Sequence, residues 1–256
     1  MDYIIAIPSY NRPTILRDRT LSVLRKYNIP KDKIFVFVAD QSEYQTYLHT
    51  LPSDSYQSLI IAQKGLHNAR NFINSYFPLD SFIVQADDDI RGFLEFDPSC
   101  PRSEKPLTDL HLLIQRGFQE ALQHNCRLWG VYPSANGFFM TDTVTSDLRL
   151  IVGSFWGQIN PGNQISLDFS EKEDYLRTLL FFKADASVVR LNFVSPQTSY
   201  YKTPGGMRSD DRKLNQQIAV EELFKRFPDL VRLNPSRKTG FPEIRLKNLK
   251  PKKISS

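Results

Sequence analysis

Short apolar runs alternate with helix-like patterns along the first half of the chain. The runs are four or five residues long and rich in Ile, Val and Phe, as strands buried on both faces are. They lie at Tyr3 to Ile7, Ile34 to Val38, Leu59 to Ala62 and Phe82 to Gln85. Apolar residues at helical spacing occupy the segments Thr14 to Tyr27, Glu43 to Leu48 and Asn68 to Tyr76. This alternation predicts βα units that build a mostly parallel sheet.

The second half of the chain has a less regular pattern, which begins after a loop marked by Pro98, Pro101 and Pro106. It predicts helices at Leu107 to Asn125, Glu171 to Phe182 and Asp210 to Phe227, strands at Leu128 to Tyr132, Leu148 to Ser154 and Val188 to Phe193, and a Gly205-Gly206 turn. The sequence shows no internal repeat. We therefore expect one α/β domain, residues 1–247, followed by a basic tail, residues 248–256.

The composition is that of an ordinary globular protein, with 41% hydrophobic and 24% charged residues among 256. Cys100 and Cys126 are far from any metal-ligand spacing, so no disulfide framework is expected. The N-terminus runs directly into an apolar strand, and no apolar run approaches the roughly 18 residues of a membrane span. These features predict a soluble protein of a reducing compartment.

The net charge of +5 is unevenly distributed. The segment from Arg232 to Ser256 carries eight basic residues and one acid, a net of +7, whereas the rest of the chain carries −2. Such a basic segment suits a polyanion such as nucleic acid or an anionic membrane surface. A solvated terminus that aids solubility would show the same charge pattern, and charge alone does not separate the two.

Three adjacent carboxylates follow the fourth predicted strand, in the segment FIVQADDDIRGF. Asp87, Asp88 and Asp89 repel one another unless a cation or an exposed loop relieves them. Mg²⁺ and Mn²⁺ take carboxylate oxygens and share their remaining positions with substrate phosphates. Ligands bind at the carboxyl ends of strands in open α/β sheets, so the position of the triplet favours a metal site over an acidic turn.

A second polar loop follows the first predicted strand, in the segment IIAIPSYNRP. Pro13 in the first helical turn makes Asn11 or Arg12 the expected N-cap of the next helix. This loop and the acidic triplet should therefore lie at the same edge of the sheet. Tyr10 offers an aromatic face and Arg12 a charge to a nucleotide, although a core tyrosine and a surface arginine fit the same pattern.

These two segments together resemble the nucleotide-diphosphosugar transferases of the GT-A fold, a Rossmann-like, mostly parallel mixed sheet flanked by helices. In that family a strand and a P-x-[YF]-N-R loop open the nucleotide pocket, and an acidic DxD signature binds ribose and the metal-bound pyrophosphate. The resemblance implies a donor site that includes Pro8, Tyr10, Arg12, Asp87 and Asp88. It implies Mn²⁺ or Mg²⁺ bound by Asp89, with Asp87 as a further ligand.

Two other segments match the same family. Asp40 in FVFVADQSE corresponds to the acidic residue after the second strand that contacts the base. The segment HNARN, residues 67–71, corresponds to a loop-to-helix segment whose Asn and Arg line the donor site, which here implies Asn68 and Arg70. Many metal-dependent members add a late His ligand. This chain has no His after His124, so water or another oxygen group would complete the metal shell.

A narrower resemblance covers most of the chain. The blocks AIPSYNRP, GLHNARNF, VQADDDIRGF, EKEDY, YKTPGGMRSDDR and NPSRKTGFPEIRL, in this order, are similar to the TET-associated glycosyltransferases of bacteriophages. That resemblance implies transfer of a sugar, taken as glucose from UDP-glucose, to 5-hydroxymethylcytosine or a related hydroxymethylpyrimidine in DNA. It also implies a phage protein acting in the cytoplasm of the infected bacterial host.

Glu171, Glu173 and Asp174 stand at the start of a predicted helix, where carboxylates are favoured by the helix dipole and serve as ordinary caps. In GT-A enzymes a carboxylate of a comparable ED segment removes the proton from the acceptor hydroxyl. The resemblance therefore implies Asp174 as the general base, with Glu173 second. In the same reading the departing diphosphate would be held by a lid and basic residues, which include Lys202, Gly205, Gly206, Arg208, Arg237, Lys238 and Arg245. An ordinary turn at the glycines and a role for the late arginines on DNA are the alternatives.

Two rival functions keep the same fold. One is a glycosyltransferase whose acceptor is a glycan, a lipid or a protein. The other is a catalytically silent module that binds nucleotide or DNA, although intact acidic segments at residues 87–89 and 173–174 argue against a decayed site.

Overall fold

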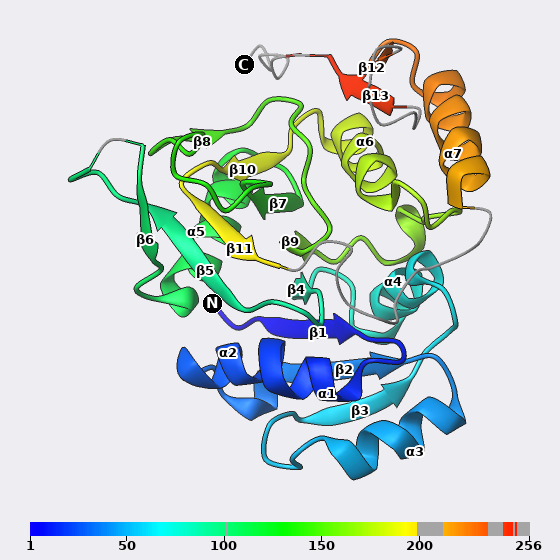
Figure 1. Ribbon diagram of the computed structural model, residues 1–256. Coiled ribbons are helices and arrows are strands. Elements are labelled where there is room, and N and C mark those ends of the chain that lie inside the picture. The colour runs from blue at the N-terminus through cyan, green and yellow to red at the C-terminus, as the bar shows by residue number, and fades with distance from the viewer. Residues whose placement is uncertain (101, 199–211, 235–242, 248, 250–256) are drawn as a thin grey trace.

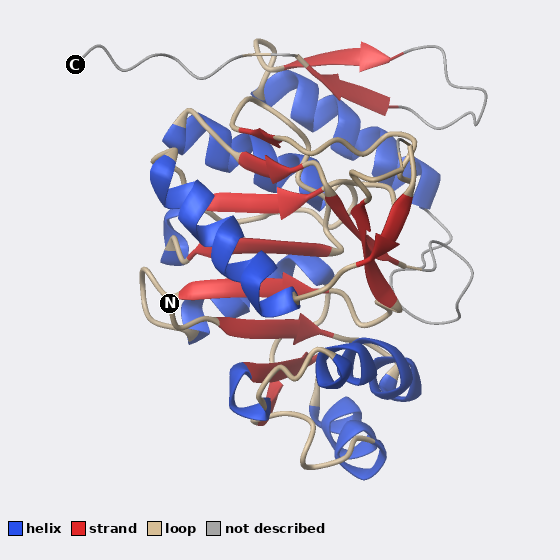
Figure 2. Ribbon diagram, turned by 90° about the vertical axis from the view of Figure 1, so that its left-hand side faces the viewer, coloured by secondary structure: helices blue, strands red, loops and turns tan. Residues whose placement is uncertain are grey.

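The structure is a computed structural model of the chain, and it describes residues 1–100, 102–198, 212–234, 243–247 and 249. Its largest element is an eight-stranded sheet with helices on both faces (Figure 1, Figure 2). From one edge to the other the strands are β3 (Ser58–Ile61), β2 (Ile34–Val38), β1 (Ile4–Pro8), β4 (Phe82–Ala86), β9 (Phe155–Ile159), β7 (Leu128–Val131), β10 (Val189–Leu191) and β8 (Val144–Thr145).

The first half of the sheet confirms the prediction of parallel βα units, because β3, β2, β1 and β4 all run parallel. Strand β9 is antiparallel to both β4 and β7, and it joins this half to the pair β7 and β10, which are again parallel. The sheet is therefore mixed and mostly parallel, as expected.

Two smaller sheets complete the strands. One is formed by β11 (Val194–Gln197), β5 (Gly92–Phe96) and β6 (Glu104–Pro106), and the other by β12 (Val231–Asn234) and β13 (Glu243–Leu246). The sequence pattern missed β5 and β6, because their run holds the prolines that predicted a loop. Pro106 nevertheless pairs with Leu94 at the edge of this small sheet, where a proline costs no central hydrogen bond.

The helices follow the predicted positions with shifted ends. They are α1 (Pro13–Leu16), α2 (Ser22–Lys26), α3 (Gln41–Thr50), α4 (Leu66–Tyr76), α5 (Leu110–Gln123), α6 (Glu173–Asp185) and α7 (Arg212–Arg226), with 3₁₀ turns at Lys31–Lys33 and Gly162–Gln164. The first predicted helix is divided, because a π-helical segment, Arg17–Leu21, lies between α1 and α2. Among the described helices, none has the length and apolar character that spanning a membrane requires.

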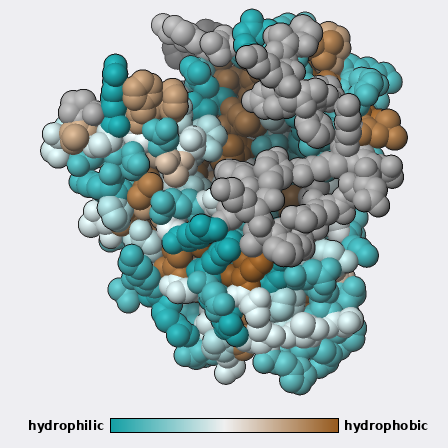
Figure 3. All heavy atoms as spheres, viewed as in Figure 1, coloured by the Kyte–Doolittle hydropathy of each residue, from teal (hydrophilic) through white to brown (hydrophobic). Residues whose placement is uncertain are grey.

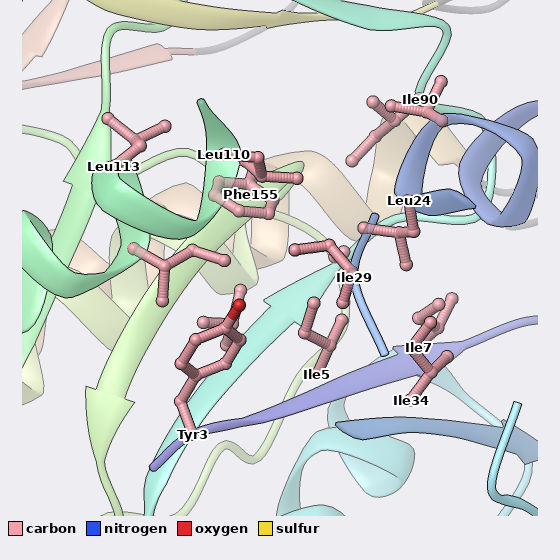
Figure 4. Packing of buried hydrophobic residues seen from close by; sticks show 14 of the residues in the cluster. Tyr3, Ile5, Ile7, Leu24, Ile29, Ile34, Ile90, Leu110, Leu113 and Phe155 are labelled. Atoms are coloured by element: carbon pink, nitrogen blue, oxygen red, sulfur yellow. The ribbon is translucent and has the colours of Figure 1, made fainter. Parts of the chain in front are cut away.

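The hydrophobic core lies on both faces of the large sheet. Alternate residues of β1 point to opposite faces: Ile5 and Ile7 pack with Leu24, Leu110 and other residues of the largest cluster, shown in Figure 4. Ala6, between them, belongs to a separate cluster against α4. Because neither face of β1 is solvated, its sequence is a continuous apolar run rather than an alternating one.

The predicted strand Leu148 to Ser154 is wrong, and the strand in this region is β9. The backbone of the predicted segment bonds to side chains of α6 instead of to a neighbouring strand: Ile151 N–H donates to Thr178 Oγ1 (3.1 Å), and Ile151 C=O accepts from Arg177 (2.7 Å). The other late strand, predicted as Val188 to Phe193, corresponds to the shorter β10, and the next strand, β11, begins at Val194 and belongs to a different sheet.

The basic C-terminal segment is partly built into the fold. Strands β12 and β13 pair, with Arg232 opposite Arg245, and both side chains are exposed. Val231 and Ile244 are buried in a second core cluster with residues of α6 and α7. Leu249, past the predicted domain boundary, packs on this cluster, and its C=O accepts from Leu148 N–H (3.0 Å).

Candidate active site

A cavity of about 370 Å³ opens at the carboxyl ends of β1, β2 and β4. Its wall is built from the loop after β1, the end of β2, the segment before α4 and the acidic turn after β4. These contribute residues 8–10, 37–39, 63–66 and 87–89, with Arg12 and Ala69. The parallel βα units thus bring the two polar loops of the sequence to one site, where open α/β sheets bind ligands.

Asp88, in the middle of the acidic turn, is held from the side of the first loop. Its Oδ2 accepts from Ser9 Oγ (2.6 Å), and its Oδ1 accepts from Arg12 Nη1 (3.2 Å). Tyr47 of α3 lies beneath this loop, with its hydroxyl 2.7 Å from Ser9 Oγ and accepting from Arg12 N–H (3.0 Å). Burial raises the pKa of Asp88 to about 6 despite these contacts. Asp88 therefore anchors the turn.

The backbone of the acidic turn is held by Thr20, a buried residue of the π-helical segment. Thr20 Oγ1 donates to Asp87 C=O (2.7 Å) and accepts from Ile90 N–H (3.0 Å), so one hydroxyl spans the turn. On the opposite side, Asp87 N–H donates to Ser154 C=O (2.9 Å). The turn is thus fixed by three contacts that leave its outer carboxylates available.

Asp87 and Asp89 are those outer carboxylates. Asp87 is 38% exposed and lies 3.5 Å from Arg70 Nη2, while Asp89 is 12% exposed and lies 3.9 Å from Arg12 Nη1. Desolvation raises the pKa of Asp87 to about 7, and the neighbouring Asp89, Asp88 and Glu173 add to the increase, which Arg70 opposes. The site therefore holds more negative charge than its arginines neutralise.

The carboxylates of Asp87 and Asp89 suit a divalent cation whose other ligands come from water and substrate phosphates. Within the described part of the chain, no group of three or more His, Cys, Asp or Glu side chains is arranged to hold a metal alone. Mg²⁺ and Mn²⁺ are commonly held by one or two carboxylates, with water and substrate phosphates filling the other positions. Burial, and to a lesser extent the neighbouring carboxylates, raise the pKa of Asp87, and a bound cation would favour its ionised form.

Arg70 links the acidic turn to α6. It is 2% exposed, its Nη2 lies 3.2 Å from Glu173 Oε1, and it donates to Gly153 C=O (3.1 Å). Glu173 also accepts from Arg177 Nη1 (2.8 Å), and Arg177 stacks on the Trp156 ring (3.9 Å). An added Cβ at Gly153 would lie 2.9 Å from Glu173 Oε1, so glycine makes room for this pairing.

The two carboxylates expected to act as bases differ in their surroundings. Both oxygens of Glu173 are paired with arginines, as a structural counter-ion would be. Asp174 accepts from Tyr175 N–H (2.9 Å), and desolvation with Glu173 nearby raises its pKa to about 6. Neither side chain lines the cavity. The geometry favours Asp174 over Glu173 as a base, and both assignments stay predictions.

Of the remaining residues predicted for the donor site, Tyr10 lines the cavity, whereas Asn68 and Asp40 do not. Lys64 Nζ lies 5.5 Å from the centre of the Tyr10 ring. Gly65 lines the wall with φ +100°, a conformation that glycine adopts readily, and Asn68 Nδ2 donates to Lys64 C=O (2.9 Å). Asp40 is the N-cap of α3, where it accepts from Glu43 N–H (3.0 Å), and it does not line the cavity although Ala39 does.

Several predicted residues lie outside the described residues. They are Lys202, Gly205, Gly206, Arg208, Arg237 and Lys238, so the predicted lid and the basic residues around it stay predictions.

Sequence reasoning missed Ser9, Thr20, Tyr47 and Lys64. Ser9 lies within the quoted loop, and its hydroxyl next to Tyr10 was the available signal. Lys64 precedes Gly65 at the N-terminus of α4, and helix N-termini commonly bind anions. Nothing in the sequence indicated a role for Thr20 or Tyr47, because each lies in a predicted helix whose pattern indicates only packing against the core.

The chain was compared with known proteins. No protein-family model matches it, and no curated protein does. Among solved structures, a mycobacterial protein shares 8% identity over 97% of this chain and 86% of its own, with a TM-score of 0.52. TarS of S. aureus shares 15% identity over 94% of this chain and 45% of its own, with a TM-score of 0.50.

A third structure, the mannosyltransferase PcManGT from Pyrobaculum calidifontis in complex with GDP-Man and Mn²⁺, has 12% identity over 69% of this chain and 50% of its own, with a TM-score of 0.42. This chain thus spans less than half of TarS and most of the mycobacterial protein. Sheet topology and the likeness to solved structures confirm the predicted GT-A fold.

Proposed function

We propose that the protein transfers a sugar from a nucleotide-diphosphate donor to an acceptor hydroxyl. The observation that carries this proposal is the cavity of about 370 Å³, which joins the loop after β1 to two outward carboxylates of the acidic turn. Tyr10 and Lys64 at the mouth suit a base and its phosphates, and Asp87 and Asp89 suit a phosphate-bound cation. A simple nucleotide-binding module would not require the uncompensated carboxylates.

The bound cation, Mn²⁺ or Mg²⁺, would neutralise negative charge that develops on the departing diphosphate. Asp87 and Asp89 would hold it, while Asp88 keeps both carboxylates in place through Ser9 and Arg12. Arg70 fixes the orientation of Asp87 from the buried side.

In the transfer step, the acceptor oxygen forms a bond to the anomeric carbon, and the bond from that carbon to the diphosphate oxygen breaks. The electron pair of the broken bond leaves with the diphosphate, and Asp174 accepts the hydroxyl proton. A pKa of about 6 suits a base that works near neutral pH. Glu173 keeps its pairing with Arg70 and Arg177 throughout the step.

A more specific proposal identifies the sugar donor and the acceptor. We propose UDP-glucose as donor and 5-hydroxymethylcytosine or a related base in DNA as acceptor, in the cytoplasm of a phage-infected bacterium. The exposed Arg232 and Arg245 on the paired strands β12 and β13 support a polyanionic acceptor. The 5-substituent of a pyrimidine projects into the major groove, so transfer does not by itself require extrusion of the base.

The test is release of UDP and transfer of labelled glucose with hydroxymethylcytosine DNA, hydroxymethyluracil DNA and unmodified DNA, each with and without Mn²⁺. We expect transfer only to modified DNA and only with the cation. Transfer to a glycan, lipid or protein acceptor instead would contradict the DNA acceptor and keep the transferase. No donor turnover with any acceptor would contradict the transferase itself.

A further inference from the structure

A second cavity, of about 360 Å³, lies beside the π-helical segment and outside the proposed donor site. Its lining residues are Asp18, Arg19, Ser22, Val23, Lys26 and Arg91. None of these lines the donor cavity. On the face of the molecule that carries α1 and α2, strongly hydrophilic side chains gather around this region (Figure 3).

The lining is cationic. Arg19, Lys26 and Arg91 contribute three positive charges, and the single acid, Asp18, already accepts from Arg17 Nε at 2.7 Å. Like charges that line one cavity repel one another, and an anion between them removes that repulsion. Ser22 adds a hydroxyl that can donate to the same anion.

Arg19 is the arginine that the π-helical segment contributes to the lining of this cavity. The guanidinium fork of arginine matches the oxygens of a phosphate group better than a lysine does.

The position of the cavity suggests the source of this anion. Arg19 precedes Thr20, which bonds to both ends of the acidic turn, and Arg91 lies two residues after Asp89. The cavity and the donor site are therefore adjacent, with the turn between them. Because the proposed function assigns the donor diphosphate to the acidic turn, an anion bound in this neighbouring cavity would belong to the acceptor.

We propose that this second cavity binds a phosphodiester group of the acceptor DNA, next to the base that receives the sugar. The inference rests on the proposed function, since it assigns the acceptor contact of that same site. Arg19, Lys26 and Arg91 would neutralise the phosphate, with Lys26 and Arg91 on the exposed side. π-Helical segments are frequent at functional sites, and this one places Arg19 at the cavity and Thr20 at the turn.

The test is binding of a hydroxymethylcytosine duplex in the absence of donor, so that it does not depend on sugar transfer. The double variant Lys26→Gln/Arg91→Gln changes only exposed side chains of the cavity. Lys31→Gln/Lys183→Gln removes the same charge from exposed positions elsewhere and serves as the matched control. The dissociation constant is measured over a range of salt concentrations.

We expect the cavity variant to bind the duplex about tenfold more weakly and to lower the salt slope of log K by about 1, because one phosphate contact is lost. The control should lose little, and donor hydrolysis should be unchanged in both. Equal losses in the two double variants would overturn the proposal, because they would show a general charge effect.

A second experiment uses inorganic phosphate and the variant Arg19→Gln. It distinguishes a DNA phosphodiester from a free phosphate ion as the anion that the cavity binds. We expect phosphate to compete with the duplex and to raise the melting temperature of the wild-type protein more than that of Arg19→Gln. Phosphate that stabilises the wild-type protein without competing with DNA would overturn the acceptor contact and leave a free-anion site. If DNA binds through the cavity but no sugar is transferred, the proposed function fails and the binding inference stands.

Discussion

Two groups of carboxylates lie on either side of Arg70, and they are held in different ways. In the acidic turn, Asp88 is held by a hydroxyl and one arginine, and Asp87 and Asp89 are only partly neutralised. At the start of α6, Glu173 is buried between two arginines. The difference lies in how much carboxylate charge the chain itself pairs, because arginines pair both oxygens of Glu173 and pair Asp87 and Asp89 only at longer distances. The acidic turn is therefore where we propose a cation, and Glu173 belongs to the framework that supports it.

The largest expected effect tests the framework side of this comparison. Arg177→Met removes one of the two arginine partners of Glu173, the bond to Ile151 C=O and the stacking on Trp156. Breaking a buried ion pair costs about 3–5 kcal/mol. Urea unfolding should show that loss. Lys183→Met, an exposed position on the same helix, is the control, and a loss below about 1 kcal/mol in Arg177→Met would contradict the framework role.

The next effect tests the acidic turn. Asp89→Asn should lower sugar transfer more than about 100-fold, because partners of metal ligands alone are worth 10–100-fold. Its stability should change little, since Asp89 makes no hydrogen bond that holds the turn. Asp142→Asn, at an exposed position, controls for the lost charge. Unchanged transfer by Asp89→Asn would show that the metal role assigned to this residue is wrong.

Thr20 allows a smaller test of how the turn is positioned. Thr20→Val leaves Asp87 C=O and Ile90 N–H without their buried partner and should cost about 1–3 kcal/mol. It should also weaken activation by Mn²⁺. Without the hydrogen bond to Asp87 C=O, the backbone of the turn can shift and carry the Asp87 carboxylate with it. Thr20→Ser keeps the hydroxyl, so its half-activating Mn²⁺ concentration should equal that of the wild-type protein. A stability loss in Thr20→Val with unchanged Mn²⁺ dependence would confine Thr20 to a structural role.

The smallest expected effect concerns pH. Burial raises the pKa of Asp87 to about 7 from its ordinary value of 3.8, so between about pH 4 and 7 the folded metal-free protein binds more protons than the unfolded chain. Its stability should therefore fall as pH rises through this window. Because the side chain is partly exposed, we expect about 1 kcal/mol, or 2–4 °C in melting temperature.

Asp87→Asn should remove this part of the decline, and Mg²⁺ should raise the melting temperature of the wild-type protein more at pH 8 than at pH 5. The difference between variant and wild type isolates Asp87, because the two proteins differ only at this residue. Parallel pH profiles would show that Asp87 keeps an ordinary pKa.

The sequence predicted the part of the site whose residues follow local patterns. Apolar runs identified β1 to β4, and their parallel arrangement brought the loop after β1 to the acidic turn. Local patterns did not identify Thr20 or the counter-ion role of Glu173, because both depend on residues far along the chain. Strand β9 was missed for a related reason: Leu148 to Ser154 has the apolar character of a strand, but side chains of α6 bind the backbone of Ile151 in the middle of this segment.

Strand β9 also has a consequence for how the protein is made. It fills the space between β4 and β7, and the chain reaches it only after both neighbours have been synthesised. Until Phe155 has emerged from the ribosome, β4 and β7 each present an open edge, which is a template for pairing with another chain. Early truncations should therefore aggregate rather than fold, and chaperone binding to nascent chains should end once β9 is inserted.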